Sequence, residues 1–182
     1  MKGLIFVELM NFMEEQFGEL LTDEVVDAAA IPGDAAFTTI GQYPSAYASR
    51  LIGAAADRSN ASAAELCRAF GRYLFCRFEV RFPTMIQRYP SARSLLMHVE
   101  AHIHEEVRII YPDARPPTVT ALEVDDALHV VYRSDRPFAH IAYGLVDQCI
   151  ASYGEQSTVE WCEGNDDSHA RFIIRSLHRS AA

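Results

Sequence analysis

The pattern of hydrophobic and polar positions divides the chain into a helical first part and a strand-rich last part. Apolar residues recur at helical spacing as far as residue 111. We expect helices over residues 3–18, 22–29, 45–58, 62–78, a short stretch between Pro83 and Pro90, and 91–111. Ser62 and Glu65 form a capping box that fixes the start of the fourth helix. Pro112 ends the last helix, because the residue before a proline disfavours helical geometry.

After Pro112 the period changes to that of strands. Residues 118–124 and 128–133 predict a hairpin around Asp125 and Asp126, and residues 157–162 and 170–176 predict a second hairpin around residues 163–167. Between the hairpins, Pro137 suits the first position of a helix that runs to about Tyr153, with Ser134 or Asp135 as its N-cap. This order predicts an α+β fold with a four-stranded antiparallel sheet.

Composition narrows the class of protein further. The 182 residues are 49% hydrophobic, which fits one compact domain that can have two lobes. The net charge of −9 argues against nucleic acids and anionic membrane surfaces as partners, because phosphates need a positive counterpart. The apolar start contains Glu8, which contradicts a signal peptide, and no run reaches membrane-spanning length. We therefore expect a cytoplasmic protein, whose four scattered cysteines are reduced thiols.

Three histidines crowd the expected helix over residues 91–111. Its apolar stripe consists of Leu96, Val99, Ile103, Val107 and Ile110. His98 lies roughly opposite this stripe and is expected to face solvent, whereas His102 and His104 lie on its two flanks at similar angles, so geometry alone does not separate them. His104 shares its flank with Met97 and Tyr111, which favours His104 as the inward residue.

Two kinds of metal chemistry are open to these histidines. His98 and His102 could bind zinc with Glu105 as a third ligand, as in a zinc hydrolase, but the segment lacks the His-Glu-x-x-His pattern, and a solvated polar face explains it more simply. His104 could instead ligate iron.

A candidate anion receptor follows one element downstream. Tyr132, Ser134 and Arg136 are spaced as Tyr-x-Ser-x-Arg, and a guanidinium with two hydroxyls suits a carboxylate or a phosphate. Haem is the common cofactor that needs both a metal ligand and an anchor for its two propionates.

Four segments together resemble the H-NOX family of haem domains that sense nitric oxide or oxygen. They are Met1-Lys2-Gly3, the His104 run ending in Tyr111-Pro112, Arg115-Pro116-Pro117 and the Tyr-x-Ser-x-Arg motif, in register from residue 1 to about 178. The resemblance implies a single domain with an N-terminal helical subdomain (about 1–60) and a haem-ligating α+β subdomain (about 61–182). It implies haem b as cofactor, with His104 on the iron, Pro117 against the porphyrin, and Tyr132, Ser134 and Arg136 on the propionates.

The resemblance also bears on which gas binds. Family members that bind oxygen have a tyrosine five residues after the motif arginine, and this chain has Ile141 there. Two supporting positions are Leu9 and Leu74, with Ile5 nearby, so no distal side chain donates a hydrogen bond to oxygen. A helix turns Tyr143 about 200° away from Ile141. We therefore expect binding of nitric oxide and carbon monoxide and exclusion of oxygen.

The resemblance implies a sensor without catalytic activity. In the family, nitric oxide breaks the bond between iron and the histidine, and the N-terminal helices then move. The chain ends about where the sensing domain ends, so we expect no fused output domain but a separate effector, a histidine kinase or a cyclic-di-GMP enzyme. A haem-free module of the same fold, binding another small ligand, is the alternative. A second, zinc site of some relatives is incomplete here: Cys162 matches one ligand and His140 lies near another, but Ala170, beside His169, replaces a third.

Overall fold

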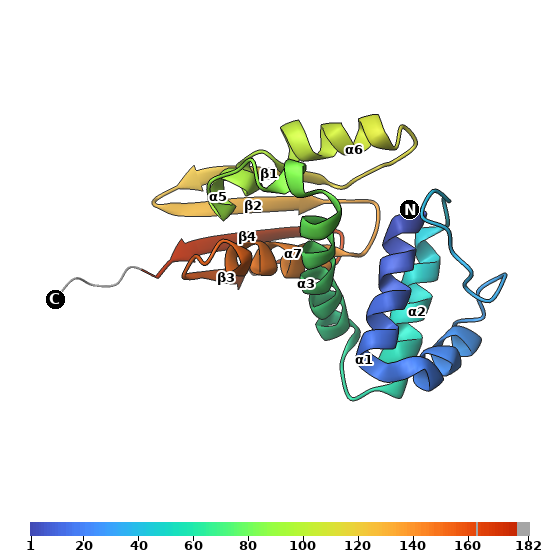
Figure 1. Cartoon of the computed structure of the whole chain (residues 1–182). Coiled ribbons are helices and arrows are strands. Elements are labelled where there is room, and N and C mark those ends of the chain that lie inside the picture. Colours follow the sequence, from blue (N-terminus) through green and yellow to red (C-terminus); the bar gives the residue numbers. More distant parts are fainter. Residues whose placement is uncertain (163, 178–182) are drawn as a thin grey trace. The chain divides into compact units, whose positions relative to one another are not determined.

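The computed structural model describes residues 1–162 and 164–177, which form two compact units, Met1–Phe70 and the chain from Gly71 onward (Figure 1). The helices are α1 (Gly3–Ala29), α2 (Ser45–Arg58), α3 (Ala63–Arg81), α4 (Pro83–Ile86), α5 (Ala92–Met97), the π-helical η1 (Val99–His104), α6 (Glu105–Ile110) and α7 (Ala139–Ser152). The strands are β1 (Thr118–Val124), β2 (Ala127–Arg133), β3 (Ser157–Trp161) and β4 (His169–Ser176). No helix among these residues is both long and apolar enough to cross a membrane.

The first unit is helical, as predicted. Its long helix α1 is interrupted at Gly18, whose φ of 79° and ψ of 166° are a backbone conformation that residues other than glycine adopt only with strain. The buried Thr22 donates its hydroxyl to the carbonyl of Gly18 at 2.9 Å, which satisfies a group that the break exposes. The two predicted helices over residues 3–18 and 22–29 therefore lie on either side of this kink.

Aromatic packing fixes the N-terminal end of this unit. Phe6 is fully buried and stacks on Phe37 with 4.5 Å between ring centroids, while Tyr43 meets Phe6 edge-on at 5.5 Å. The Ser62–Glu65 capping box also forms as predicted, because the Ser62 N–H donates to the Glu65 carboxylate at 2.8 Å and the Glu65 N–H donates to the Ser62 hydroxyl at 3.3 Å. The start of α3 is thus set by local sequence.

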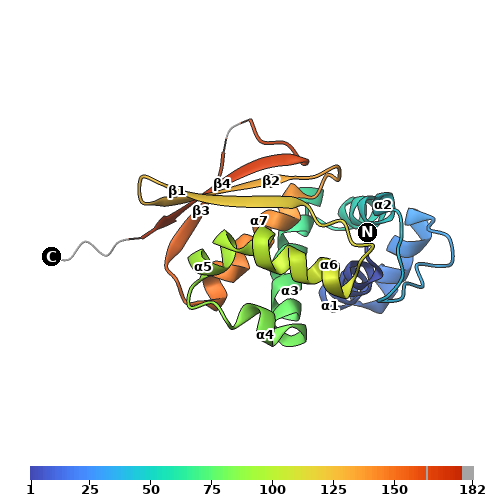
Figure 2. The same ribbon diagram turned by 90° about the horizontal axis from the view of Figure 1, so that it is seen from above.

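The second unit contains the predicted four-stranded antiparallel sheet, with the strand order β1-β2-β4-β3. Asp125 and Asp126 join β1 to β2 with φ values of 48° and 61°, the geometry of a type I′ hairpin turn. The other predicted hairpin, β3 with β4, also forms, but Glu163 of its connection lies outside the described residues. Figure 2 shows α5 and α7 against the same face of the sheet.

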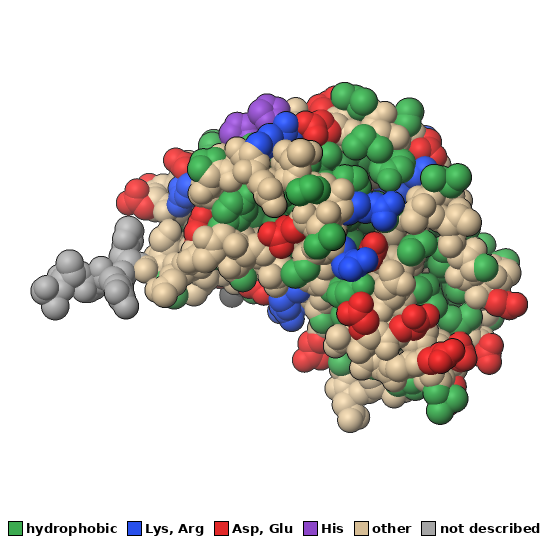
Figure 3. Space-filling model, in the orientation of Figure 1, with side chains coloured by type: hydrophobic (Ala, Val, Ile, Leu, Met, Phe, Trp, Pro, Cys, Tyr) green, Lys and Arg blue, Asp and Glu red, His purple; other side chains and the backbone are tan. Residues whose placement is uncertain are grey.

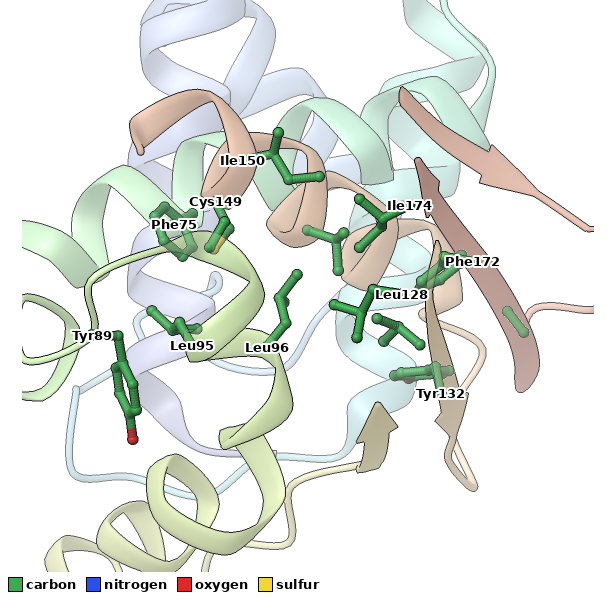
Figure 4. Packing of buried hydrophobic residues seen from close by; sticks show 14 of the residues in the cluster. Phe75, Tyr89, Leu95, Leu96, Leu128, Tyr132, Cys149, Ile150, Phe172 and Ile174 are labelled. Carbon is green, nitrogen blue, oxygen red and sulfur yellow. The ribbon is translucent and has the colours of Figure 1, made fainter. Parts of the chain in front are cut away.

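The core of the second unit lies between this sheet face and the helices. Leu128 of β2 and Phe172 of β4 are fully buried there, against Leu95 and Leu96 of α5 and Ile150 of α7 (Figure 4). Tyr132 belongs to the same cluster, so the first residue of the Tyr-x-Ser-x-Arg motif is anchored in the core.

The segment that carries the histidines differs from the prediction. Instead of one α-helix over residues 91–111, three short helices follow one another, with a break at His98 (φ −110°, ψ 6°). The His98 carbonyl accepts hydrogen bonds from the N–H groups of His102 (2.9 Å) and Ile103 (3.3 Å), and the second of these is the wider bond of a π-helix. A fixed 100° per residue therefore does not hold here, and His98, expected to face solvent, is half-buried.

The start of α7 is a second correction. We predicted that Pro137 begins it with Ser134 or Asp135 as N-cap, but α7 begins at Ala139 without a side-chain cap. The Ser134 hydroxyl instead accepts the N–H of Arg136 at 3.1 Å, and the Ala139 N–H donates to the carbonyl of Asp167 at 2.9 Å. A loop far along the chain supplies the acceptor, and local sequence does not reveal such a partner.

Candidate functional site

His104 is the last residue of η1 and turns most of its side chain inward. The side chain is 12% exposed, whereas His102 lies exposed on the surface. Burial lowers the pKa of His104, while the hydrogen bond and charge of Glu100 act in the opposite direction without reversing the shift. The imidazole is therefore neutral near neutral pH. Because Nδ1 lies 3.0 Å from a Glu100 carboxylate oxygen, the ring donates there and Nε2 carries the lone pair that can bind a metal.

Glu100 is a functional candidate that sequence reasoning missed. Its Oε2 accepts the N–H of Val119 at 3.0 Å as well as the His104 bond, and its Oε1 accepts a 3.0 Å hydrogen bond from Arg108. Burial raises the pKa of Glu100, but the bonds from Val119, His104 and Arg108 outweigh it and lower the pKa overall. The i, i+4 spacing of Glu100 and His104 was the signal available in the sequence.

The other two histidines form a stack at the surface. Their rings lie 4.8 Å apart, His102 Nδ1 is 3.0 Å from the Tyr89 hydroxyl, and His98 Nδ1 is 2.7 Å from the Ser94 carbonyl. Figure 3 shows histidine side chains gathered at the surface beside the left end of α6. Glu105, the third ligand of the zinc alternative, binds Arg108. Within residues 1–162 and 164–177, no group of three or more His, Cys, Asp or Glu residues could hold a metal ion.

The Tyr-x-Ser-x-Arg motif lies at the end of β2. Tyr132 is buried, Ser134 is half-buried, and the Arg136 side chain is 17% exposed. Arg136 donates a 2.9 Å hydrogen bond to the carbonyl of Arg115, the residue before Pro116-Pro117. The structure thus brings the half-buried Pro117 and its loop to the arginine of the motif.

One strand connects the candidate metal ligand to the candidate anion receptor. Val119 of β1, whose N–H donates to Glu100, pairs with Tyr132 of β2 across the sheet. The second unit therefore places the neutral imidazole of His104, the guanidinium of Arg136 and the hydroxyls of Tyr132 and Ser134 near the β1–β2 pair. Haem fits this donor set, because its iron takes a neutral histidine and its propionates take charge-assisted hydrogen bonds.

The four expected distal residues are all apolar and lie on three helices. Leu74 of α3 and Ile141 of α7 are buried in the second unit. These helices approach closely at Gly71, where a Cβ atom would lie 2.2 Å from the Ile141 carbonyl oxygen. On α1 of the first unit, Leu9 is buried and Ile5 is partly exposed.

The Tyr143 hydroxyl is already engaged in a hydrogen bond within the second unit. Tyr143 donates to the carbonyl of Val159 on β3 at 2.9 Å, and its ring meets Phe172 edge-on at 5.7 Å. The hydroxyl is therefore committed to the sheet, in agreement with the helical phase difference from Ile141.

The residues weighed for a second metal site have other neighbours. His140 stacks on Trp161 with 4.2 Å between ring centroids and lies 3.7 Å from Asp167. Cys162 is buried as a free thiol, and Ala170 is buried in the core. These residues therefore pack against other side chains where β3 ends and β4 begins.

Comparisons with known proteins agree with this architecture. The family model described as Haem-NO-binding (HNOB) matches residues 2–161. The H-NOX protein from K. algicida, in its Fe(II) unliganded crystal structure, is 26% identical over 100% of both chains, with a TM-score of 0.91. An S. oneidensis H-NOX protein in the Fe(II)NO ligation state is 22% identical over 98% of this chain and 100% of that one, with a TM-score of 0.87.

A T. tengcongensis H-NOX mutant, I5F, is 21% identical over 98% of each chain, with a TM-score of 0.86. Like the S. oneidensis structure, it shows the common fold alone. No curated protein matches the chain. Because the family model spans most of the sequence and the α+β fold is shared over its length, this chain belongs to the H-NOX family.

Proposed function

We propose that this chain, a member of a family of haem-based gas sensors whose cofactor is haem b, binds its haem through His104 and responds to nitric oxide. The observation that carries the proposal is the His104–Glu100 pair, which leaves Nε2 as the metal donor of a largely buried, neutral imidazole. When bound, haem supplies a ferrous iron to which diatomic gases bind.

We assign the propionates to Tyr132, Ser134 and Arg136, and a porphyrin contact to Pro117. The support is the bond from Arg136 to Arg115, which holds the Pro116-Pro117 loop beside the motif. Arg136 supplies a fixed positive charge, and the two hydroxyls add hydrogen bonds of defined direction.

The proposed gas preference follows from side-chain chemistry. Ile5, Leu9, Leu74 and Ile141 have no group that can donate a hydrogen bond, and Tyr143 is bonded to Val159. Oxygen retention depends on a distal donor that stabilises its partial negative charge, whereas nitric oxide and carbon monoxide need none. We therefore propose that both gases bind and that oxygen is excluded.

We further propose that the chain signals to a separate cytoplasmic effector, a histidine kinase or a cyclic-di-GMP enzyme, and catalyses no reaction itself. H-NOX domains are sensor modules, which supports a role in signal transduction. In this proposal the helical subdomain and the haem-ligating subdomain make up one sensing domain.

An absorption spectrum of the purified, reduced chain tests the proposed function. We expect a haem spectrum that is unchanged in air and that shifts when nitric oxide or carbon monoxide is added. A chain that stays colourless after reconstitution with haem contradicts the proposal and favours the haem-free module. A stable oxygen spectrum contradicts the proposed selectivity.

Arg136→Ala is expected to weaken haem binding, because it removes the cation of the propionate site. A charge-assisted hydrogen bond contributes about 1.5–3 kcal/mol, so haem affinity falls roughly ten- to a hundredfold. The measurement is the rate of haem transfer to an apo-globin acceptor. Arg133→Ala is the matched control. Arg133 is exposed and follows the buried Tyr132 on β2, so its side chain points to the opposite face of the sheet from the proposed propionate site. Equal rates for both variants contradict the assignment.

A further inference from the structure

We propose that Glu100 is a positioning residue for the iron ligand: it fixes the His104 ring, strengthens its donation to iron and couples it to strand β1. This inference rests on the proposed function, and it adds a residue that is not among those nominated from the sequence. Glu100 does not touch the haem in this proposal and acts through His104.

The first step is the orientation of the ring. His104 Nδ1 lies 3.0 Å from Glu100 Oε2, so the proton of the neutral ring is on Nδ1 and the lone pair is on Nε2. Metal-bound histidines commonly donate their second ring N–H to a carboxylate, which fixes the tautomer and makes the ligand more basic. A full negative charge at that position therefore strengthens the bond from Nε2 to iron.

The second step is that Glu100 is itself held in place. Arg108 binds its Oε1 at 3.0 Å, and Arg108 is also bound by Glu105 at 2.6 Å. The Val119 N–H binds its Oε2 at 3.0 Å. Two donors other than His104, one on each oxygen, therefore define the position of the carboxylate, and the carboxylate in turn fixes the imidazole.

The third step is the mechanical connection. β1 is an edge strand of the sheet, and the Val119 N–H, which donates to Glu100, points to the side without a neighbouring strand. Val119 comes two residues after Pro117 and pairs with Tyr132 on β2. A displacement of the His104 ring therefore acts, through one carboxylate, on the strand that joins the porphyrin contact to the propionate site.

The π-helical geometry agrees with this role. His104 ends the only π-helical segment of the described residues, and such segments often occur at functional sites. Glu100 and His104 both lie within it, at a spacing of four residues, so the wider turn sets how the carboxylate meets the ring.

The test compares Glu100→Gln with Glu105→Gln in the full-length haem protein. Glutamine is isosteric and retains an acceptor for Val119, but it removes the charge that faces His104. We expect Glu100→Gln to lower the iron–histidine stretching frequency measured by resonance Raman spectroscopy of the reduced, ligand-free protein. We also expect haem loss roughly ten- to a hundredfold faster, the usual effect of removing such a partner of a metal ligand. Glu105→Gln, which removes only the second partner of Arg108, leaves both unchanged.

A second measurement needs no variant. In the diamagnetic carbon monoxide form of the wild-type protein, proton NMR should detect the His104 Nδ1–H as a slowly exchanging, strongly hydrogen-bonded signal. A rapidly exchanging Nδ1–H overturns the inference even where Glu100→Gln does not fold.

The failure of the inference can be told apart from failure of the proposed function. A wild-type chain that binds no haem overturns both. If His104→Gly loses haem while Glu100→Gln keeps the wild-type stretching frequency, His104 is the ligand and Glu100 serves only the edge of β1. That result overturns the inference alone.

Discussion

Replacing His104 with glycine is expected to abolish haem retention, and added imidazole is expected to restore it. The substitution removes the proposed iron ligand and leaves space for a free imidazole at the same position. Loss of a partner of a ligand already weakens a metal site roughly ten- to a hundredfold, so loss of the ligand itself should exceed about a hundredfold. The measurement is the haem absorption of the purified variant, with and without imidazole in the buffer.

His102→Gly is the matched control, because His102 lies two residues away but is exposed and bonded to Tyr89. This variant should keep its haem. If His102→Gly bleaches the protein and His104→Gly does not, the inward residue of η1 has been misassigned. Thermal unfolding of both variants separates loss of haem from loss of fold, since glycine in a helix destabilises it by about 1 kcal/mol.

Ile141→Tyr is expected to move the protein towards oxygen binding. Ile141 is 8% exposed near the start of α7, and a tyrosine there adds a hydroxyl donor to the otherwise apolar set of proposed distal residues. The change should be incomplete, because Leu9 and Leu74 cannot orient the new hydroxyl by hydrogen bonds. The measurement is the absorption spectrum of the reduced variant in air, followed over time.

Ile141→Phe is the matched control, because phenylalanine has the aromatic ring of tyrosine but lacks its hydroxyl. Both aromatic side chains are larger than isoleucine and carry a similar overpacking penalty, typically about 1–3 kcal/mol. Only the tyrosine variant should gain an oxygen spectrum. A gain in both variants would show that altered packing of α7, rather than a hydrogen bond, controls oxygen binding.

The elements set by local chemistry could be predicted from the sequence. The Ser62–Glu65 capping box bonds as expected, and Asp125 and Asp126 form the expected two-residue turn. Each depends on groups within three residues of one another, so neighbouring residues suffice. The alternation in β1 and β2 similarly predicted a hairpin, since strand period and turn chemistry agree.

For the candidate site, the sequence nominated residues, and the folded structure distinguished between two of them. Residue types and spacings, together with the family resemblance, nominated His104 and the Tyr-x-Ser-x-Arg motif, and their roles stay predictions. Helical phase did not separate His104 from His102, because at 100° per residue both lie on the flanks of the apolar stripe at similar angles. In the structure the segment is π-helical, so a step of 100° does not describe it. Burial of one ring and exposure of the other distinguish them in the folded chain.

By itself, the sequence determined the α+β order of elements, the hairpins and the family, because these depend on short-range periodicity and on residues at fixed spacing. Only the tertiary structure decided where α7 begins and which groups Glu100 contacts. The N–H of Ala139 is satisfied by the carbonyl of Asp167, and the Glu100 carboxylate by the N–H of Val119. Backbone donors find such partners only after distant segments have packed together, so a linear pattern carries no record of them.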